Sequence, residues 1–168
     1  MKFLDESGFS QWSPVSYSYA KVGSQKVLEQ TKKRGRRLSV LGLLEKGVSF
    51  EYGLKIGSFN RESDLKLMEW QVKEAAERLE ITGQITVIVQ DNHPIHVSQQ
   101  VKEYWDDWQE KGLYPFQLPK YSSQMNLIET EWHQLKIHEL AGRMFEDEYD
   151  LALAVIEGIE ARAERVGY

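Results

Sequence analysis

The chain has 168 residues, with 21 Lys plus Arg against 26 Asp plus Glu, and no cysteine. This length is that of one domain, and the lack of cysteine excludes a disulfide scaffold and any zinc site built on thiolates. No apolar run approaches the roughly 20 residues that span a bilayer. The N-terminus does not resemble a signal peptide, so a cytoplasmic protein is expected. Residues 1–60 carry a net charge of +5 and residues 61–168 one of −10, which leaves room for a local basic face.

Strand patterns dominate the first third of the chain. Alternating or continuous apolar residues predict four strands, at Lys2–Asp5, Pro14–Lys21, Leu38–Leu44 and Val48–Ile56. Glu45-Lys46-Gly47 predicts a hairpin turn between the last two, because Gly47 can adopt a positive φ. A basic cluster, Lys32–Arg37, precedes this hairpin.

The rest of the chain alternates helices with two further strands. Spacing of about 3.6 residues between apolar positions predicts helices at Ser63–Glu80, Ser98–Lys111, Leu127–Leu140 and Tyr149–Val166. Ile85–Gln90 is a continuous apolar run, as expected for a buried parallel strand, and Leu113–Leu118 is a shorter strand. The expected fold is therefore α/β: a mixed sheet, with an antiparallel hairpin and parallel strands, flanked by helices. This order of elements resembles the ribonuclease H-like fold.

Three carboxylates occupy special places in this order. Asp5 is expected to end the first strand, Asp91 follows the strand Ile85–Gln90, and Glu129 lies in the first turn of a helix. Ligand sites in open α/β sheets lie beyond the carboxyl ends of parallel strands, so the three side chains can meet there. Clustered carboxylates repel one another unless cations neutralise them, and all-oxygen ligands suit Mg²⁺ or Mn²⁺. A pair of such ions suits in-line displacement at phosphorus.

The segments that carry these carboxylates resemble the DDE catalytic domain of insertion-sequence transposases in the mariner-like superfamily. They are Asp5-Glu6-Ser7-Gly8-Phe9, Asp91-Asn92 followed by His96, and Leu118–Glu129 followed by Trp132 and Leu135-Lys136. The order and the gaps, 85 residues and then 37, make the likeness specific. It implies that Asp5, Asp91 and Glu129 bind two Mg²⁺ or Mn²⁺ ions. It also implies DNA cleavage at element ends, followed by strand transfer to target DNA.

The start of the chain departs from that family. Such transposases have helix-turn-helix domains before the first aspartate, whereas only four residues precede Asp5. The expectation is a single catalytic domain, residues 1–168, from a split or truncated transposase that works as a homo-oligomer or with an upstream DNA-binding half. Two alternatives stay open, a non-catalytic fragment that regulates full-length transposase and a free-standing ribonuclease H-like nuclease.

Basic residues near this chemistry are candidates for phosphate contacts. The expected DNA-binding set is Lys32, Lys33, Arg34, Arg36, Arg37, His96, His133 and Lys136. A solvated loop is the alternative for the basic cluster, and a solvated helix face is the alternative for His133 and Lys136. For His96 the alternative is a zinc ligand, because His93 and His96 have a His-x-x-His spacing. Trp12, with Tyr17 and Tyr19, is a candidate for stacking on unpaired bases. For Glu129 the alternative is a capping box, in which Asn126 is the N-cap and Glu129 bonds back to the N-cap N–H.

Overall fold

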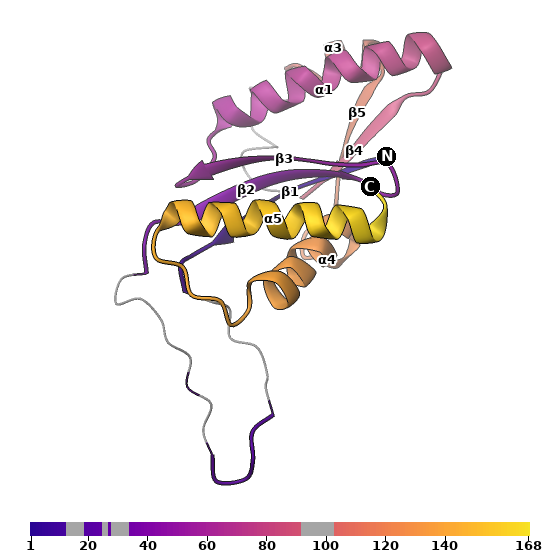
Figure 1. Cartoon of the computed structure of the whole chain (residues 1–168). Coiled ribbons are helices and arrows are strands. Elements are labelled where there is room, and N and C mark those ends of the chain that lie inside the picture. The colour runs from indigo at the N-terminus through magenta and orange to yellow at the C-terminus, as the bar shows by residue number, and fades with distance from the viewer. Residues whose placement is uncertain (13–18, 25–26, 28–33, 92–102) are drawn as a thin grey trace.

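Five strands form one sheet in the order β3-β2-β1-β4-β5 (Figure 1). The structure is a computed structural model that describes residues 1–12, 19–24, 27, 34–91 and 103–168. The strands are β1 (Lys2–Phe9), β2 (Leu38–Glu45), β3 (Ser49–Ile56), β4 (Thr86–Gln90) and β5 (Leu113–Gln117). β2 pairs antiparallel with β1 and β3, whereas β4 pairs parallel with β1 and β5. The predicted mixed sheet is therefore confirmed.

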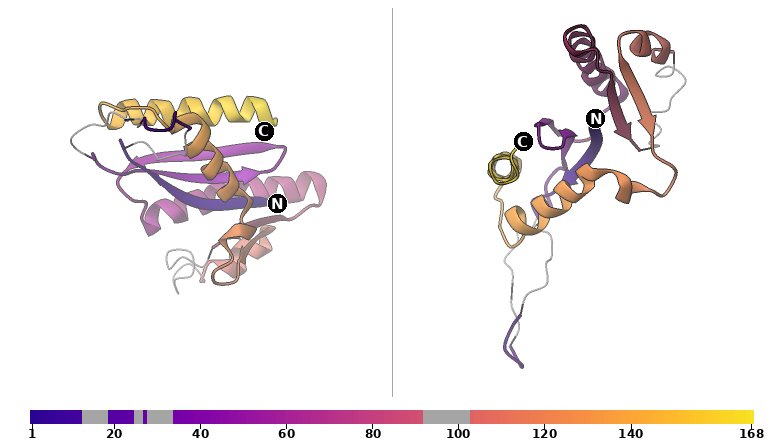
Figure 2. Two further views of the ribbon diagram at one scale, coloured as in Figure 1. Left: turned by 90° about the horizontal axis from the view of Figure 1, so that it is seen from below. Right: turned by 90° about the vertical axis from the view of Figure 1, so that its right-hand side faces the viewer.

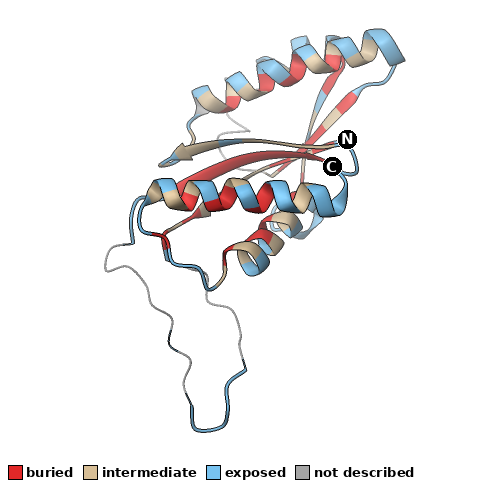
Figure 3. Ribbon diagram, in the orientation of Figure 1, coloured by how far each residue is buried: buried red, intermediate tan, exposed pale blue. Residues whose placement is uncertain are grey.

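Helices cover both faces of the sheet, so each face has its own apolar core (Figure 2). One core lies under α1 (Arg61–Thr82) and α3 (Trp105–Glu110). The other lies under α4 (Leu127–Gln134), the π-helical turn η2 (Leu135–Leu140) and α5 (Glu148–Val166). All eight residues of β2 are buried between the two cores, as Figure 3 shows. None of the described helices is long and apolar enough to cross a membrane.

Local signals set the bounds of the main helices close to their predicted positions. The side chain of Asn60 accepts a hydrogen bond from the Ser63 N–H at 3.0 Å and so caps the start of α1. Gly83, at φ 71°, ends the helix in the left-handed conformation. The hairpin turn after Glu45 also forms as predicted, with Gly47 at φ 74°.

The first strand is longer than predicted. It runs to Phe9, so Asp5 lies inside β1 and does not end it. Because the run Asp5–Gly8 is polar, the apolar pattern does not predict that the strand continues there. In the structure, antiparallel pairing with β2 continues from Phe3 to Phe9. The parallel pairing of β1 with β4 covers only Lys2 and Phe3. Beyond it, the side of β1 next to Asp5 is no longer paired with β4.

Two other predicted elements fall partly outside the described residues. For the weak strand Pro14–Lys21, the structure describes only residues 19–21, which are not in a strand. For the helix Ser98–Lys111, it describes residues 103–111, where α3 begins at Trp105. The short helix η1 (Ser123–Met125), which was not predicted, precedes α4.

The helix predicted at Leu127–Leu140 changes from an α-helix to a π-helix halfway along its length. Its second half, η2, is a π-helical turn that lies against α5 at Gly158. A Cβ atom on Gly158 would lie 2.6 Å from Leu135 Cδ1 and 3.0 Å from Glu139 Cβ. The missing side chain at Gly158 therefore makes room for the wider turn.

Candidate active site

Asp5 lies where side chains of α4 pack directly on the sheet. In the β1–β2 ladder its partner is Gly42, and the side chains of Trp132 and Ile128 lie directly over Gly42. A Cβ atom on Gly42 would lie 2.5 Å from Trp132 Cζ2 and 3.0 Å from Ile128 Cδ1. Because paired residues of an antiparallel ladder point to the same face, Gly42 lets α4 rest beside Asp5.

Asn126 fixes the start of α4 to the sheet. Its side-chain Nδ2 donates a hydrogen bond of 2.9 Å to the backbone carbonyl of Leu4, the residue before Asp5, and Asn126 is only 2% exposed. Its side chain does not cap the helix, and its N–H donates to the carbonyl of Ser123 at 2.8 Å. The capping-box alternative for Glu129 is therefore wrong, because the side chain of Asn126 bonds to the carbonyl of Leu4 on β1 and does not cap the helix.

The negative charges of Glu129 and Asp91 act on Asp5. The pKa of Asp5 rises to about 7, first because of burial, then because of the negative charges of Glu129 and Asp91. The Glu6 backbone N–H and the Trp132 indole oppose this rise, although the buried indole N–H has no described partner at hydrogen-bonding geometry. Such a raised carboxylate pKa indicates a site where negative charge lacks compensation.

The placement of Asp91 follows from the parallel register. Phe3 pairs with Val89, so two residues further along the strands Asp5 comes level with Asp91, just after β4 ends. Glu129 reaches the same place from the first turn of α4, and its carboxylate makes no hydrogen bond with a described residue. The topology therefore brings together residues from β1, the end of β4 and α4.

The three carboxylates suit a hard divalent cation, although they do not lie close enough together to surround one. All three groups offer oxygen, which Mg²⁺ and Mn²⁺ prefer, and their mutual repulsion favours a cation between them. Among the residues described, no three His, Cys, Asp or Glu side chains are close enough together to hold an ion as they stand. The carboxylates fit the metal in chemistry, and binding would need them to approach further.

Lys136 connects this cluster with the end of β1. Its Nζ donates to Ser7 Oγ at 2.8 Å and lies 5.1 Å from the centre of the Phe9 ring. Burial lowers its pKa, while the charges of Glu129 and Asp5 oppose that shift. Lys136 is thus held within electrostatic range of both carboxylates, which the sequence did not reveal.

The other basic residues of the expected DNA-binding set differ in their surroundings. Arg37 forms an ion pair with Glu6 at 3.2 Å, and Arg36 does so with Glu148 at the start of α5, at 3.4 Å. The Arg34 guanidinium lies 5.9 Å from the centre of the Trp12 ring. His133 is exposed on α4. Lys32, Lys33 and His96 lie outside the described residues, and contact with DNA stays a prediction for the whole set.

Gly42 and Asn126 are the site residues that sequence reasoning missed or misassigned. A glycine inside the apolar run Leu38–Leu44 is the signal that was available for Gly42, because such a glycine often marks a close approach. Asn126 was assigned to a cap. No local pattern indicates the long-range contacts that give them their roles.

Comparison with known proteins shows the family and the fold of the chain. The family described as DDE superfamily endonuclease matches residues 1–152. Comparison with curated proteins gives no match. Among solved structures, the Mos1 mariner paired-end complex with Mn has a TM-score of 0.66 at 17% identity, covering 98% of this chain and 52% of that one. The corresponding complex with Mg has a TM-score of 0.68 at 16% identity, covering 98% and 49%.

The isolated catalytic domain of Mos1 mariner transposase gives the same result, with a TM-score of 0.56 at 13% identity, covering 98% of this chain and 77% of that one. These likenesses confirm the predicted ribonuclease H-like fold. The chain spans about half the length of the chains in the two paired-end complexes.

Proposed function

Because the chain belongs to the DDE superfamily endonucleases, we propose that it is the catalytic part of a DNA transposase in the cytoplasm. The observation that carries the proposal is the approach of the end of β4 and the first turn of α4 to Asp5, whose pKa rises through burial and through the charges of Glu129 and Asp91. The substrates in the proposal are the ends of a mobile element and a target DNA. The partners are further copies of the chain or a DNA-binding half encoded upstream.

In this proposal Asp5, Asp91 and Glu129 hold two Mg²⁺ or Mn²⁺ ions. Asp5 would contribute to both ion sites, and Asp91 and Glu129 would each contribute to one. When bound, the ions activate the attacking oxygen and stabilise the leaving oxygen of an in-line displacement at phosphorus. Asn126 and Gly42 act indirectly, since they set how closely α4, and with it Glu129, approaches Asp5.

Two phosphoryl transfers follow in the proposed reaction. Water attacks a phosphodiester at the element end, and the leaving group is a free 3′-OH. That 3′-OH then attacks a phosphodiester of the target. The new P–O bond joins the element to the target's 5′-phosphate, and the target's own 3′-oxygen leaves as a 3′-OH. The carboxylates orient both steps, and no covalent bond between protein and DNA is required.

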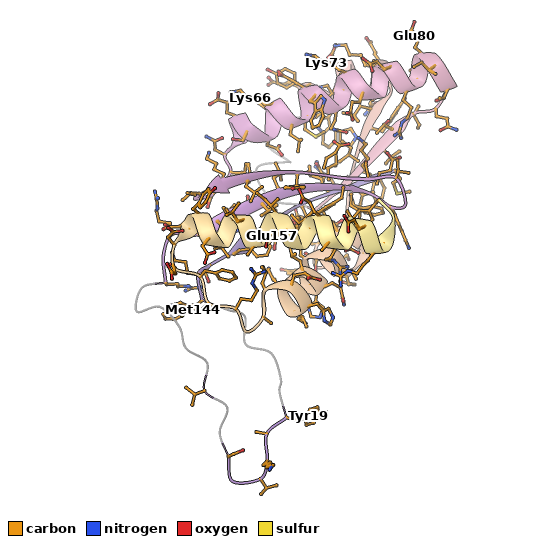
Figure 4. All side chains as sticks on the ribbon, viewed as in Figure 1. Tyr19, Lys66, Lys73, Glu80, Met144 and Glu157 are labelled. Carbon is orange, nitrogen blue, oxygen red and sulfur yellow. The ribbon has the colours of Figure 1, made fainter. Side chains whose placement is uncertain are left out.

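The cleavage test uses a nicked duplex with Mg²⁺ or Mn²⁺ and follows strand cutting on a denaturing gel. We expect metal-dependent cleavage that Asp91→Asn and Glu129→Gln each reduce by at least about a hundredfold, the range typical for loss of one electrostatic contact to a transition state. Glu157→Gln is the matched control, because Glu157 is an exposed residue on the outer side of α5 (Figure 4). Cleavage that survives both carboxylate changes would contradict the assignment.

A further inference from the structure

The ring of Trp132, on α4, packs on the sheet beside Asp5. Gly42 is the partner of Asp5 in the β1–β2 ladder, and Trp132 Cζ2 lies 2.5 Å from the place where a Cβ atom on Gly42 would be. Directly paired residues of an antiparallel ladder have their Cβ positions about 4.5–5.5 Å apart on one face. Because Cζ2 belongs to the nitrogen side of the indole, that side of the ring stands next to the Asp5 side chain.

Two phenylalanine rings hold the indole in this place. Phe9 on β1 meets it edge-on, with the ring centres 6.3 Å apart, and Phe50 on β3 does so at 5.4 Å. Trp132 is only 2% exposed, so neighbouring side chains enclose its ring. The packing of α4 on the sheet therefore sets the position of the indole N–H group.

The Trp132 N–H is a buried donor with no acceptor at hydrogen-bonding geometry within the described part of the chain. Burial keeps water away from it, and an unsatisfied buried donor is unfavourable. Glu131, the preceding residue, has its Oε2 engaged by hydrogen bonds from Arg162 and Tyr168. Asp5 is the carboxylate on which the indole acts, because the Trp132 N–H opposes the rise in the pKa of Asp5.

We propose that the Trp132 N–H is a positioning donor, which binds one carboxylate oxygen of Asp5 when the three carboxylates close around divalent ions. A hydrogen bond to the charged form of Asp5 favours that form and fixes its orientation, so the remaining lone pairs can face the ions with Asp91 and Glu129. Partners that orient metal ligands in this way contribute about 10–100-fold to metal affinity. Trp132 itself touches no ion, and the inference rests on the proposed metal site.

The test replaces Trp132 with benzothienylalanine, which has the shape of tryptophan but carries a sulfur atom in place of the N–H. Binding of Mn²⁺ is followed by the electron paramagnetic resonance signal of the free ion, in the absence of DNA. We expect the replacement to weaken Mn²⁺ binding by about 10–100-fold without lowering the melting temperature in EDTA. The same replacement at Trp108, which is 3% exposed in the core on the opposite face, is the matched control and should leave Mn²⁺ binding unchanged.

A second measurement needs no replacement in the core. In isotope-labelled wild type, Mg²⁺ should shift the nuclear magnetic resonance signal of the Trp132 indole N–H downfield, because a hydrogen bond to Asp5 forms. The signal of Trp108 should stay in place, and Asp5→Ala should abolish the shift at Trp132. If the benzothienyl protein does not fold, this signal alone decides.

Wild-type Mn²⁺ affinity in the folded benzothienyl protein would overturn the positioning role and leave the metal site in place. An indole signal that does not move in wild type saturated with Mg²⁺ would do the same. A wild type that binds neither ion would overturn the metal site and the positioning role together. The expected loss of affinity, in a protein that cuts no DNA, would keep the positioning role and remove the transposase function.

Discussion

Gly42 decides how closely α4 approaches the sheet beside Asp5. An alanine there would push its Cβ into the buried ring of Trp132, which cannot move freely. We expect Gly42→Ala to lower the free energy of unfolding by about 1–3 kcal/mol, the usual cost of overpacking. Chemical denaturation measures this loss. Gly53→Ala on β3 is the matched control, because no heavy atom lies within 4 Å of its added Cβ. Equal stability of the two variants would show that the contact at Gly42 does not matter.

The raised pKa of Asp5 makes the metal-free protein sensitive to pH. The folded state keeps a proton on Asp5 up to about pH 7, whereas the unfolded chain releases it near the ordinary value of 3.8. The stability that this proton contributes is complete below about pH 4 and is lost as the pH rises through about 7. Asp5→Asn lacks the titration, so its melting temperature relative to wild type should increase across this window in EDTA. A constant difference would contradict the raised pKa.

At the scale of elements, the hydrogen bond between Asn126 and Leu4 connects α4 to β1. Asp is as good an N-cap as Asn, so Asn126→Asp would be harmless if the residue only capped the helix. In the structure the change removes the donor to Leu4 and buries a further carboxylate beside Glu129 and Asp5. We expect a loss of at least about 1–3 kcal/mol in unfolding free energy, more at neutral than at acid pH. Unchanged stability would restore the cap interpretation.

The elements were predictable where local pattern and tertiary environment agree. The apolar run of β2 and the spacing in α1 and α5 gave their positions within a few residues, and the structure shows that Asn60 and Gly83 set the ends of α1. Prediction failed where contacts with residues distant in the sequence determine the local structure. The polar run Asp5–Gly8 becomes strand through pairing with β2, and the π-helical turn of η2 depends on the space at Gly158. Strand order made it predictable that Asp91 and Glu129 lie near enough to Asp5 to raise its pKa, whereas their role as metal ligands stays a prediction.

At the scale of the whole molecule, the positive charge of residues 1–60 is expected to contact DNA. Neutralising Lys32, Lys33, Arg34, Arg36 and Arg37 should weaken binding to duplexes of any sequence alike. The log–log dependence of affinity on salt should fall by about 0.9 per lost phosphate contact. Titrations at several salt concentrations measure this slope. An unchanged slope would show that the cluster does not contact the phosphate backbone.

The most direct test of the carboxylate site is the effect of Mg²⁺ on the melting temperature, because it requires no activity. A cation that binds only the folded state stabilises it, and with a Kd near 1 mM, about 10 mM Mg²⁺ contributes about 1.4 kcal/mol. For a chain of this size we expect a rise of roughly 3–5 °C. Asp91→Asn and Glu129→Gln should each melt at or above wild type without metal and lose most of the rise, while Glu157→Gln should keep it. A full Mg²⁺ response in Asp91→Asn and Glu129→Gln would contradict a metal site built on Asp5, Asp91 and Glu129.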